Sequence, residues 1–322
     1  MIKIGVIGVG KLGKLHATIL KESTDFELVG CFDNDPIALK NVCESLDIMP
    51  YTSALSLIKD CDAIDIVTNA SSHYEYAVAA LKNAKHVFIE KPFTQTLQEA
   101  QHLVQLSHEA DVKIQVGYIE RFNPAYKNIE NINPQPLFIE SHRLSTFDPR
   151  GTDTSVVLDL MVHDLDIILQ LVKANVKNIQ ANGVSVISDN IDIANARIEF
   201  DNGCVVNITA SRISMKKMRK MRIFQKDAYI SMDFLDKKTE IIKIVDDEIE
   251  TGLALHINGK TKNIVVKQPK NAPSNALLEE LESFGNSIKN NKKTVVNAED
   301  ALKSMELAFE ILKKIKRNSF EN

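Results

Sequence analysis

Short apolar runs alternate with segments of helical periodicity over the first third of the chain. Runs that are almost wholly apolar predict strands buried on both faces, and apolar residues three and four positions apart predict the helices between them. This alternation is typical of βαβ units and predicts a doubly wound parallel sheet of the Rossmann type. The predicted strands are Ile4–Ile7, Glu27–Phe32, Ala63–Val67, His86–Ile89 and Lys113–Val116, and the predicted helices are Leu12–Lys21, Pro36–Glu44, His73–Lys82 and Leu97–Ala110.

The pattern changes after Pro124, where one strong helix is followed by successive strand-like runs. This order indicates an α+β domain with a large, mainly antiparallel open sheet. Asp201-Asn202-Gly203 predicts a hairpin with a type I′ turn, because Asn and Gly tolerate positive φ. We expect the two C-terminal helices to pack across the domains. The predicted helices are Val156–Val172, Ala276–Lys289 and Ala298–Arg317, and the predicted strands are Leu137–Thr146, Val176–Ile187, Ile193–Phe200, Val205–Arg212, Met221–Gln225 and Tyr229–Phe234.

Length and composition fit an α/β protein of two domains. The 322 residues suffice for two cores, so we expect a dinucleotide-binding domain over residues 1–120 and a substrate-binding and oligomerisation domain over residues 121–322. The formal charge of −4 argues against a nucleic-acid partner. We interpret the one dense basic segment, residues 216–222, as a solvated loop and strand.

The cysteines and the apolar segments exclude several other classes. Cys31, Cys43, Cys61 and Cys204 form no CxxC pair, which predicts neither a zinc site nor a disulfide framework and favours free thiols in the cytosol. The sequence contains no targeting signal at its start and no apolar run approaching about 18 residues, so we expect a cytoplasmic enzyme without membrane insertion. We also expect a homodimer or homotetramer, because the open sheet must be covered on its exposed face.

The hexapeptide Gly8-Val9-Gly10-Lys11-Leu12-Gly13 directly follows a predicted strand and precedes a predicted helix. Glycines there permit a tight turn and a close approach of the backbone to a pyrophosphate at the helix N-terminus. Asp33 ends the second strand 20 residues after Gly13. It would accept hydrogen bonds from the adenosine ribose and repel a 2′-phosphate, so we expect NAD rather than NADP, with Asn34 as a further contact. The alternative role of Asp33, a helix cap, suits Asp35 better.

Two polar segments follow the predicted strands that end at Val67 and Ile89. In a doubly wound sheet these strand ends open toward the ligand crevice. Thr68, Asn69 and Ala70 are small, and the first two are polar, as expected for a loop that lets a cofactor ribose approach its backbone. His73 either contacts the cofactor or merely begins a helix. Glu90-Lys91-Pro92 is the second segment, and we take Glu90 and Lys91 as cofactor contacts. A lysine in a partly desolvated cleft is also suited to proton transfer.

A third motif lies on the predicted helix that follows Arg150-Gly151. Asp159 and His163 are four residues apart, so they share a helix face and can project into one cleft. An exposed acid–histidine pair is the alternative. Metal ligation is a further possibility that we do not favour, because no other His or Cys stands at metal-like spacing.

These motifs together resemble the Gfo/Idh/MocA family of oxidoreductases over the whole chain. The resemblance implies that Lys91 and His163 act at a reacting hydroxyl group. The loop from Thr68 to His73 departs from the family's commoner Thr-Pro start by having Asn69. Residues 116–124 and 156–166 resemble family members that oxidise the 3-hydroxyl of UDP-N-acetylglucosamine.

Four side chains are candidate partners for sugar hydroxyls or a diphosphate. Arg offers a planar fork of donors suited to such groups, although each Arg could instead pair with a neighbouring carboxylate. Asp159 and His163 join this substrate-binding set. The four candidates are Arg121, Asn123, Arg143 and Arg150.

The resulting hypothesis is an NAD-dependent oxidation of a ring hydroxyl on a sugar or sugar nucleotide. Lys91 would relay the hydroxyl proton, His163 would act as a neighbouring acid–base or orienting group, and Asp159 would bind substrate or tune the pair. One alternative is an inositol or other polyol dehydrogenase, or a carbonyl or imine reductase, on the same fold. Another is a non-catalytic NAD-binding regulator, against which the presence of Lys91, Asp159 and His163 together argues.

Overall fold

The computed structural model describes residues 1–130, 132–149, 152, 154–245, 253–257, 260–271 and 273–319. It divides into two compact units, Met1–Ile119 with Asn275–Glu306 and Glu120–Ser274 with Leu307–Asn322. The change of unit between Ile119 and Glu120 lies next to the predicted domain boundary at residue 120. The observed units differ from the prediction further on, because residues 275–306 belong with the N-terminal unit rather than with a continuous second domain.

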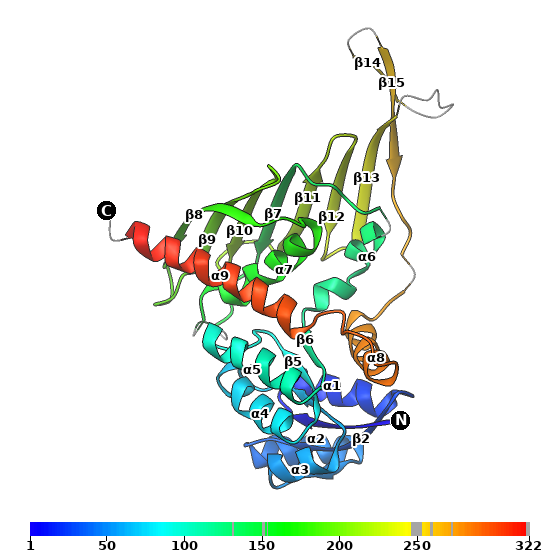
Figure 1. The fold of residues 1–322 in the computed structure, drawn as a ribbon, viewed down its shortest axis with the longest axis vertical. Helices are drawn as coiled ribbons and strands as arrows, with labels where there is room; N and C mark the ends of the chain where they lie inside the picture. Colours follow the sequence, from blue (N-terminus) through cyan, green and yellow to red (C-terminus); the bar gives the residue numbers. More distant parts are fainter. Residues whose placement is uncertain are drawn as a thin grey trace. The chain divides into compact units, whose positions relative to one another are not determined.

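The first unit is built on a six-stranded sheet in the order β3-β2-β1-β4-β5-β6, in which all neighbouring strands are parallel. This confirms the predicted doubly wound sheet. Its elements, shown in Figure 1, are β1 (Ile2–Ile7), α1 (Lys11–Glu22), β2 (Phe26–Phe32), α2 (Pro36–Leu46), β3 (Met49–Pro50), α3 (Ala54–Asp60), β4 (Ala63–Ile66), α4 (Ala70–Lys82), β5 (His86–Glu90), α5 (Leu97–Glu109), β6 (Ile114–Gly117) and α8 (Ala276–Lys289).

A shared apolar core explains why α8 joins this unit although it is far away in sequence. Leu277, Leu281 and Phe284 of α8 are buried in the same hydrophobic cluster as β1, β2 and α1. The Phe284 ring packs on the rings of Phe26 and Phe88, with centroid distances of 6.5 and 5.9 Å. Burial of such large side chains contributes about 1.5–3 kcal/mol each, which is enough to recruit a distant helix.

The second unit contains a nine-stranded sheet in the order β14-β15-β13-β12-β11-β7-β10-β9-β8. Only β7 and β10 pair in parallel, so the sheet is mainly antiparallel as predicted. Its elements are a 3₁₀ turn (Ile119–Phe122), α6 (Pro124–Glu130), β7 (Phe138–Leu144), a π-helical turn (Val157–Met161), α7 (Val162–Leu171), β8 (Val176–Val184), β9 (Ile193–Phe200), β10 (Val205–Ser211), β11 (Met218–Phe224), β12 (Ala228–Asp233), β13 (Lys238–Val245), β14 (Leu253–Ile257) and β15 (Lys260–Lys267). The helix α9 (Ala298–Ser319) contributes its residues from Leu307 onward to this unit, and its earlier residues belong to the first unit.

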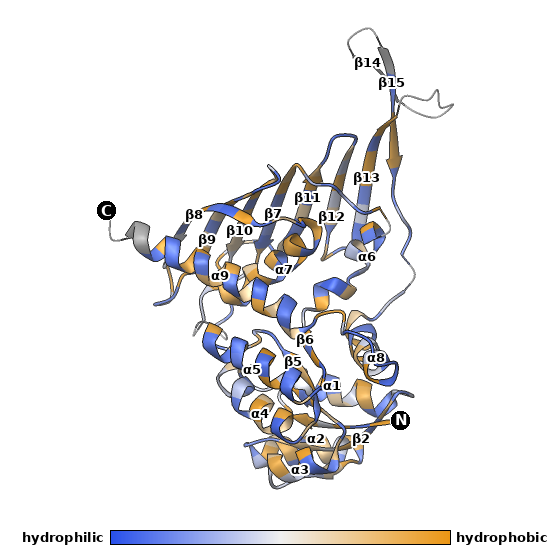
Figure 2. Ribbon diagram, viewed as in Figure 1, coloured by the Kyte–Doolittle hydropathy of each residue, from blue (hydrophilic) through white to orange (hydrophobic). Residues whose placement is uncertain are grey.

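The two faces of this sheet differ in character. On the inner face, alternate residues such as Ile139, Ile208 and Ile230 are fully buried beneath α7 and the C-terminal half of α9. The strands alternate between hydrophobic and hydrophilic residues along their length (Figure 2). The outer face carries the paired side chains of Glu140 and Arg222 and a cluster of three aromatic rings, those of Phe138, Phe224 and Tyr229. One face therefore holds the core of the unit, as expected for an open antiparallel sheet.

Two local predictions are corrected by the structure. The hairpin between β9 and β10 forms, but only Gly203 has a positive φ, 86°, whereas a type I′ turn requires it at both central residues. The helix predicted from Val156 to Val172 is interrupted, because the turn Val157–Met161 is π-helical and regular α-helix follows from Val162. None of the described helices is long and apolar enough to cross a membrane.

Candidate functional site

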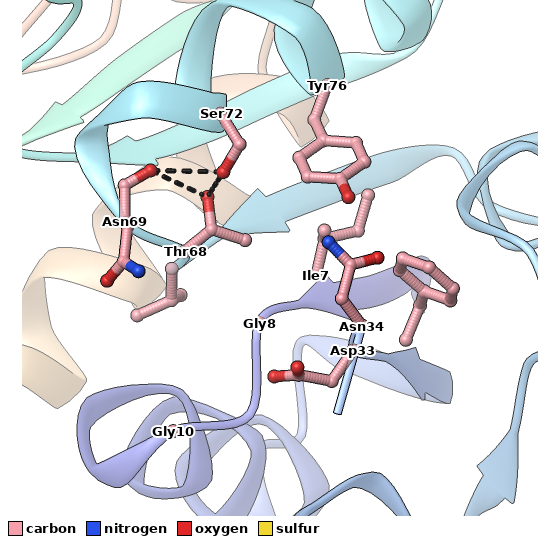
Figure 3. Close-up of a pocket in the computed structure, with 11 residues that line it drawn as sticks. Ile7, Gly8, Gly10, Asp33, Asn34, Thr68, Asn69, Ser72 and Tyr76 are labelled. Carbon is pink, nitrogen blue, oxygen red and sulfur yellow. Dashed lines mark hydrogen bonds between the residues drawn. The ribbon is translucent and has the colours of Figure 1, made fainter. Parts of the chain in front are cut away.

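A pocket of about 270 Å³ opens at the carboxyl ends of β1, β2 and β4 in the first unit. Ligands bind at this edge in open parallel sheets, where the first βα turn meets the strand ends. Figure 3 shows the carboxylate of Asp33 beside the segment from Gly8 to Gly10, with Asn34 and Tyr76 further along the pocket. The full lining is Ile7, Gly8, Gly10, Phe32, Asp33, Asn34, Val67, Thr68, Asn69, Ser72 and Tyr76.

The three glycines of the loop have three distinct structural roles. Gly8 has a φ of 93°, which favours glycine, and a Cβ there would lie 2.8 Å from the backbone of Thr68. A Cβ on Gly13 would lie 1.9 Å from the carbonyl oxygen of Gly8, so α1 packs on β1 only with glycine at that position. A Cβ on Gly10 would meet nothing within 4 Å. The space beside Gly10 is therefore open to a ligand.

The N-terminus of α1 faces this open space with its backbone. Gly10 is the N-cap residue, and no side chain caps the helix. The first N–H groups of a helix have no partner within it and carry the positive end of the helix dipole, which suits them to a phosphate. The loop therefore fits a dinucleotide pyrophosphate in its residue types and in its available space.

Asp33 connects the loop to the end of β2. Its Oδ2 accepts a hydrogen bond from the Val9 N–H at 2.7 Å, and its Oδ1 accepts one from the Asp35 N–H at 2.8 Å. A carboxylate has about four acceptor positions, so two remain for ribose hydroxyls. Asp35 caps α2 by accepting from Ile37 and Ala38, as expected, with Pro36 at the first helical position. The cap role is therefore taken by Asp35, and Asp33 lines the pocket.

The pocket includes some of the predicted cofactor contacts and leaves out others. Gly8, Gly10, Asp33, Asn34, Thr68 and Asn69 line it. Five lining residues were not predicted, and strand-end position is the only signal for Ile7, Phe32 and Val67. Ser72 and Tyr76 lie one turn apart on α4, and the Ser72 hydroxyl donates to Thr68 Oγ1 at 2.9 Å. The predicted contacts outside this lining are Lys11, Leu12, Gly13, Ala70, His73, Glu90 and Lys91.

His73 is a correction to the predicted cofactor set. Its side chain lies on the buried face of α4, and only 1% of the residue is exposed. Nδ1 lies 2.8 Å from the carbonyl oxygen of Pro92, and Nε2 lies 3.0 Å from that of Thr68. Each ring nitrogen therefore has a backbone oxygen within hydrogen-bond distance. Burial lowers the pKa of His73, and a neutral ring donates to one of these two oxygens. His73 joins two strand-end loops within the protein instead of facing a ligand.

Lys91 follows β5 at the same sheet edge and is half-buried. Its neighbour Glu90 has a carboxylate whose Oε2 accepts from the Lys91 backbone N–H at 3.2 Å, while Oε1 lies 3.4 Å from Nε2 of His16. Nδ1 of His16 in turn lies 2.9 Å from Oδ2 of Asp65 on β4. The predicted motif is thus tied to two buried residues that sequence reasoning missed.

A signal for that missed pair exists in the sequence. Asp65 lies inside Ala63–Ile66, a strand that is buried along its whole length and otherwise apolar. His16 lies on the buried side of α1 together with Gly13, Ala17 and Leu20. Ionisable residues at positions with core periodicity are rarely buried unless they are paired.

Asp159 and His163 belong to the second unit. Asp159 lies in the π-helical turn and His163 in the first turn of α7, and both side chains are half-buried. Single π-helical turns within helices occur frequently at functional sites. The local backbone here therefore differs from the regular helix on which the spacing argument for a shared face was based.

The predicted substrate contacts Arg121 and Arg143 are buried and paired within the second unit. Arg121 Nη2 lies 2.6 Å from Asp166 Oδ1, and the two side chains are 5% and 1% exposed. Arg143 donates to Asp164 at 2.5 Å and to Glu120 at 2.9 Å. Of the two alternatives for these arginines, the structure shows the carboxylate pairing.

Asn123 is likewise used internally. Its amide donates to Glu120 Oε2 at 2.9 Å and to the Phe234 carbonyl at 3.0 Å, and its Oδ1 accepts from the Ala125 N–H. Asn followed by Pro is a helix-start signal, which could have identified this role. Arg150, the fourth candidate, lies outside the described residues.

Comparison with known proteins identifies both parts of the chain. Residues 2–118 match the model of an oxidoreductase family with an NAD-binding Rossmann fold, and residues 132–231 match the GFO/IDH/MocA C-terminal domain. A UDP-N-acetylglucosamine 3-dehydrogenase from Acidithiobacillus ferrooxidans is 37% identical over 241 residues, which cover 74% of this chain and 76% of the relative. A myo-inositol 2-dehydrogenase from Thermotoga maritima is 24% identical over 96% of this chain and 94% of its own.

Solved structures agree with these matches. The structure of the Acidithiobacillus ferrooxidans enzyme aligns with a TM-score of 0.89 and 31% identity over 98% of both chains. A scyllo-inositol dehydrogenase from Lactobacillus casei, with bound NAD(H) and scyllo-inositol, shares the fold at a TM-score of 0.79 and 20% identity over 99% of this chain and 98% of its own. The chain therefore belongs to the GFO/IDH/MocA family of oxidoreductases, which confirms the predicted enzyme class, a nicotinamide-dependent oxidoreductase acting on CH–OH groups.

Proposed function

We propose that this protein is an NAD-dependent dehydrogenase that oxidises the 3-hydroxyl of UDP-N-acetylglucosamine or a closely related sugar nucleotide. The observation that carries the proposal is the 37% identity to a UDP-N-acetylglucosamine 3-dehydrogenase, which is well above the 24% identity to an inositol dehydrogenase. Both relatives oxidise a ring hydroxyl according to their names, so the reaction type is common to the two readings and only the substrate separates them.

The cofactor preference rests on Asp33. Its carboxylate lines the pocket beside Gly8 and Gly10 and retains acceptor positions for the ribose hydroxyls. A negative charge at this position repels the 2′-phosphate of NADP. The same carboxylate is fixed by the Val9 and Asp35 N–H groups, so it cannot easily turn away to admit that phosphate. These features support NAD.

The chemical step is assigned to residues at the carboxyl end of β5 and on the helix that carries His163. A bound nicotinamide would supply the hydride acceptor for the carbon that bears the hydroxyl. Lys91 follows a buried strand at the cofactor edge of the sheet, and its neutral amine accepts the proton of that hydroxyl. His163 and Asp159 bind the sugar and orient the hydroxyl. Arg121, Asn123 and Arg143 maintain the fold of the second unit instead of contacting the substrate.

A screen of candidate alcohols tests this proposal. The purified protein is incubated with NAD or NADP and one of UDP-N-acetylglucosamine, UDP-glucose, myo-inositol or scyllo-inositol, and nicotinamide reduction is followed by absorbance. We expect the highest kcat/KM with UDP-N-acetylglucosamine and NAD. A higher kcat/KM with an inositol would contradict the substrate assignment and favour the polyol alternative. Keto sugars and imines tested with NADH show whether reduction is the preferred direction.

We also propose that a second copy of the chain covers the outer face of the nine-stranded sheet. The aromatic rings of Phe138, Phe224 and Tyr229 lie together there, with centroid distances of 5.8 and 5.0 Å. Arg222 pairs with Glu140 in the next row of side chains, so the face offers apolar contact and charges of both signs to an identical surface. Light scattering should give at least twice the monomer mass, and Phe224→Asp should lower it. A monomeric wild-type protein would contradict this proposal.

A further inference from the structure

His16 is a buried histidine outside the cofactor pocket. It is fully buried on α1, within the stripe of side chains that packs on the sheet. Its partner Asp65 is also fully buried, in the middle of β4. A hydrophobic pair of similar volume often stabilises a protein as well as a buried ion pair does, so stability alone does not account for charged residues here.

Each ring nitrogen of His16 faces a carboxylate. Nδ1 lies 2.9 Å from Asp65 Oδ2 and Nε2 lies 3.4 Å from Glu90 Oε1. Nδ1 is within hydrogen-bond distance of Asp65, whereas the contact between Nε2 and Glu90 is an ion-pair contact without hydrogen-bond geometry. The imidazolium therefore interacts with the first carboxylate by a hydrogen bond and with the second by its charge. Burial alone would lower the pKa of His16, but the charges and hydrogen bonds of Asp65 and Glu90 raise it to about 10. The two carboxylates therefore favour the protonated form of His16, while burial raises the pKa of its partner Asp65.

The carboxylate of Glu90, which His16 contacts on one side, also contacts the backbone of Lys91. Its second carboxylate oxygen, Oε2, accepts from the Lys91 backbone N–H at 3.2 Å. The neighbouring strand leaves room for the carboxylate, because Gly117 pairs with Glu90 in register and a Cβ on Gly117 would lie 2.7 Å from Glu90 Oε1. The carboxylate is thus confined by His16, by the backbone of Lys91 and by the surface of β6.

The other side of Lys91 is also held by a buried histidine. The carbonyl oxygen of Pro92 lies 2.8 Å from Nδ1 of His73, whose Nε2 lies 3.0 Å from the Thr68 carbonyl. The residues before and after Lys91 are therefore both anchored, one through its side chain and the other through its backbone. A general base must be held within hydrogen-bond reach of the proton it removes, and such double anchoring of its backbone restricts where its side chain can point.

We propose that His16 is a positioning residue for proton transfer by Lys91, acting through the carboxylate of Glu90. This inference rests on the role given to Lys91 in the proposed function. His16 is not among the residues that line the pocket. Its substitution therefore changes the chemical step and leaves binding of the dinucleotide intact.

A double-mutant cycle on turnover tests this role. His16→Gln, Glu90→Gln and the double variant are compared with the wild type for kcat with the best substrate of the screen, and for NADH affinity by fluorescence. We expect each single variant to lose about tenfold to a hundredfold in kcat, as a small displacement of a catalytic group does, with the Kd for NADH changed by less than about twofold. The double variant should be no slower than the slower single variant, because both substitutions break one connection.

His86→Gln is the matched control. His86 begins β5, the strand that Glu90 ends, and its Nδ1 accepts from the Lys113 N–H at 3.0 Å. This control makes the same substitution in the same unit and should retain wild-type kcat. If the double variant loses kcat by the product of the two single losses, then His16 acts independently of Glu90. That result would overturn the proposal.

Failure of this inference can be distinguished from failure of the proposed function by the Lys91→Met variant, and from a loss of folding by NMR. Lys91→Met with near-normal kcat refutes the role of Lys91 itself, whereas an inactive Lys91→Met together with a fully active His16→Gln refutes only the positioning role. Should His16→Gln fail to fold, ¹⁵N NMR of histidine-labelled wild-type protein and the Glu90→Gln variant decide the matter. A His16 ring with one unprotonated nitrogen near pH 7.5, or a fully active Glu90→Gln, overturns the proposal.

Discussion

Nδ1 of His16 lies 2.9 Å from Oδ2 of Asp65, and both side chains are fully buried in the first unit. Removing one partner of a buried ion pair leaves the other charge uncompensated, at a cost of about 3–5 kcal/mol. We therefore expect His16→Gln to lower the free energy of unfolding by about that amount near pH 7. Urea unfolding followed by circular dichroism measures the difference. A loss below about 1 kcal/mol would mean that the pair is not charged in the folded protein.

The same pair predicts a pH dependence of known sign. The groups that face His16 are Asp65 on β4 and Glu90 on β5, and they raise its pKa from 6.5 to about 10 against the effect of burial. Below pH 6.5 the ring is protonated in both the folded and the unfolded chain, so the contribution is complete. As pH rises toward 10, the unfolded chain releases a proton that the folded chain keeps, and the stabilisation is lost. The stability difference between wild type and His16→Gln should therefore shrink from near pH 6 to near pH 10.

The glycine loop gives a prediction in which two similar substitutions act differently. A Cβ on Gly10 meets nothing within 4 Å, so Gly10→Ala should cost less than about 1 kcal/mol in stability. The added methyl group of Gly10→Ala occupies the space beside the N-terminus of α1, and should raise the Kd for NADH by about tenfold or more. Gly13→Ala places its Cβ 1.9 Å from the Gly8 carbonyl oxygen, and should destabilise the first unit by about 1–3 kcal/mol or more.

Thermal unfolding and NADH fluorescence distinguish these two effects. Gly10→Ala should melt near the wild-type temperature with weakened binding, and Gly13→Ala should melt several degrees lower. Equal losses of stability for the two variants would contradict the division of roles within the loop.

Elements with a strong local pattern were predictable from the sequence. β9 and α8 have the predicted bounds, Ile193–Phe200 and Ala276–Lys289, because alternation over most of β9 and helical spacing along α8 mark them. β3 has only two residues and is held by pairing with Gly30 and Cys31 of β2, so its own residues carry no periodic signal. The placement of α8 in the first unit depends on a distant core contact, Phe284 on Phe26, which local spacing cannot show.

The candidate site was predictable where a motif ties backbone geometry to chemistry. Gly8 and Asp33 were found because glycine and a strand-end carboxylate have few other uses at those positions. Arg121 and Arg143 were predicted to contact substrate from their residue type alone. Their carboxylate partners could not be predicted, because a sequence does not show which carboxylate an Arg contacts in the fold. The role of His16 depends on Asp65 and Glu90, which come from two other strands, so only the folded chain brings the three together.

The burial of Arg143 makes its pairing testable as a structural feature. Arg143 donates to Asp164 and Glu120 and is 2% exposed. Arg143→Met leaves both carboxylates without this cation, and should lower the free energy of unfolding by about 3–5 kcal/mol. Arg197 pairs with Glu199 at the surface of the same sheet, so Arg197→Met should cost less than about 1 kcal/mol. A folded Arg143→Met with normal stability and a greatly raised substrate KM would instead restore Arg143 to the substrate site.

Two substitutions test the proposed role of Asp33 in cofactor preference, because they separate its charge from its role in the loop. Asp33→Ser removes the charge and shortens the side chain, and should raise the KM for NAD by about tenfold while lowering that for NADP. Asp33→Asn removes the charge but keeps an oxygen that can accept from the Val9 N–H, which the wild-type carboxylate accepts at 2.7 Å.

If charge repulsion determines the preference, Asp33→Asn should gain activity with NADP. Its melting temperature should fall slightly, because the single amide oxygen can accept from the Val9 N–H but not also from the Asp35 N–H. Parallel losses with NAD and NADP in both variants would mean that Asp33 only supports the loop. A wild-type enzyme that prefers NADP by about tenfold would contradict the assignment outright, because a carboxylate fixed by two backbone N–H groups cannot accommodate the 2′-phosphate without losing them.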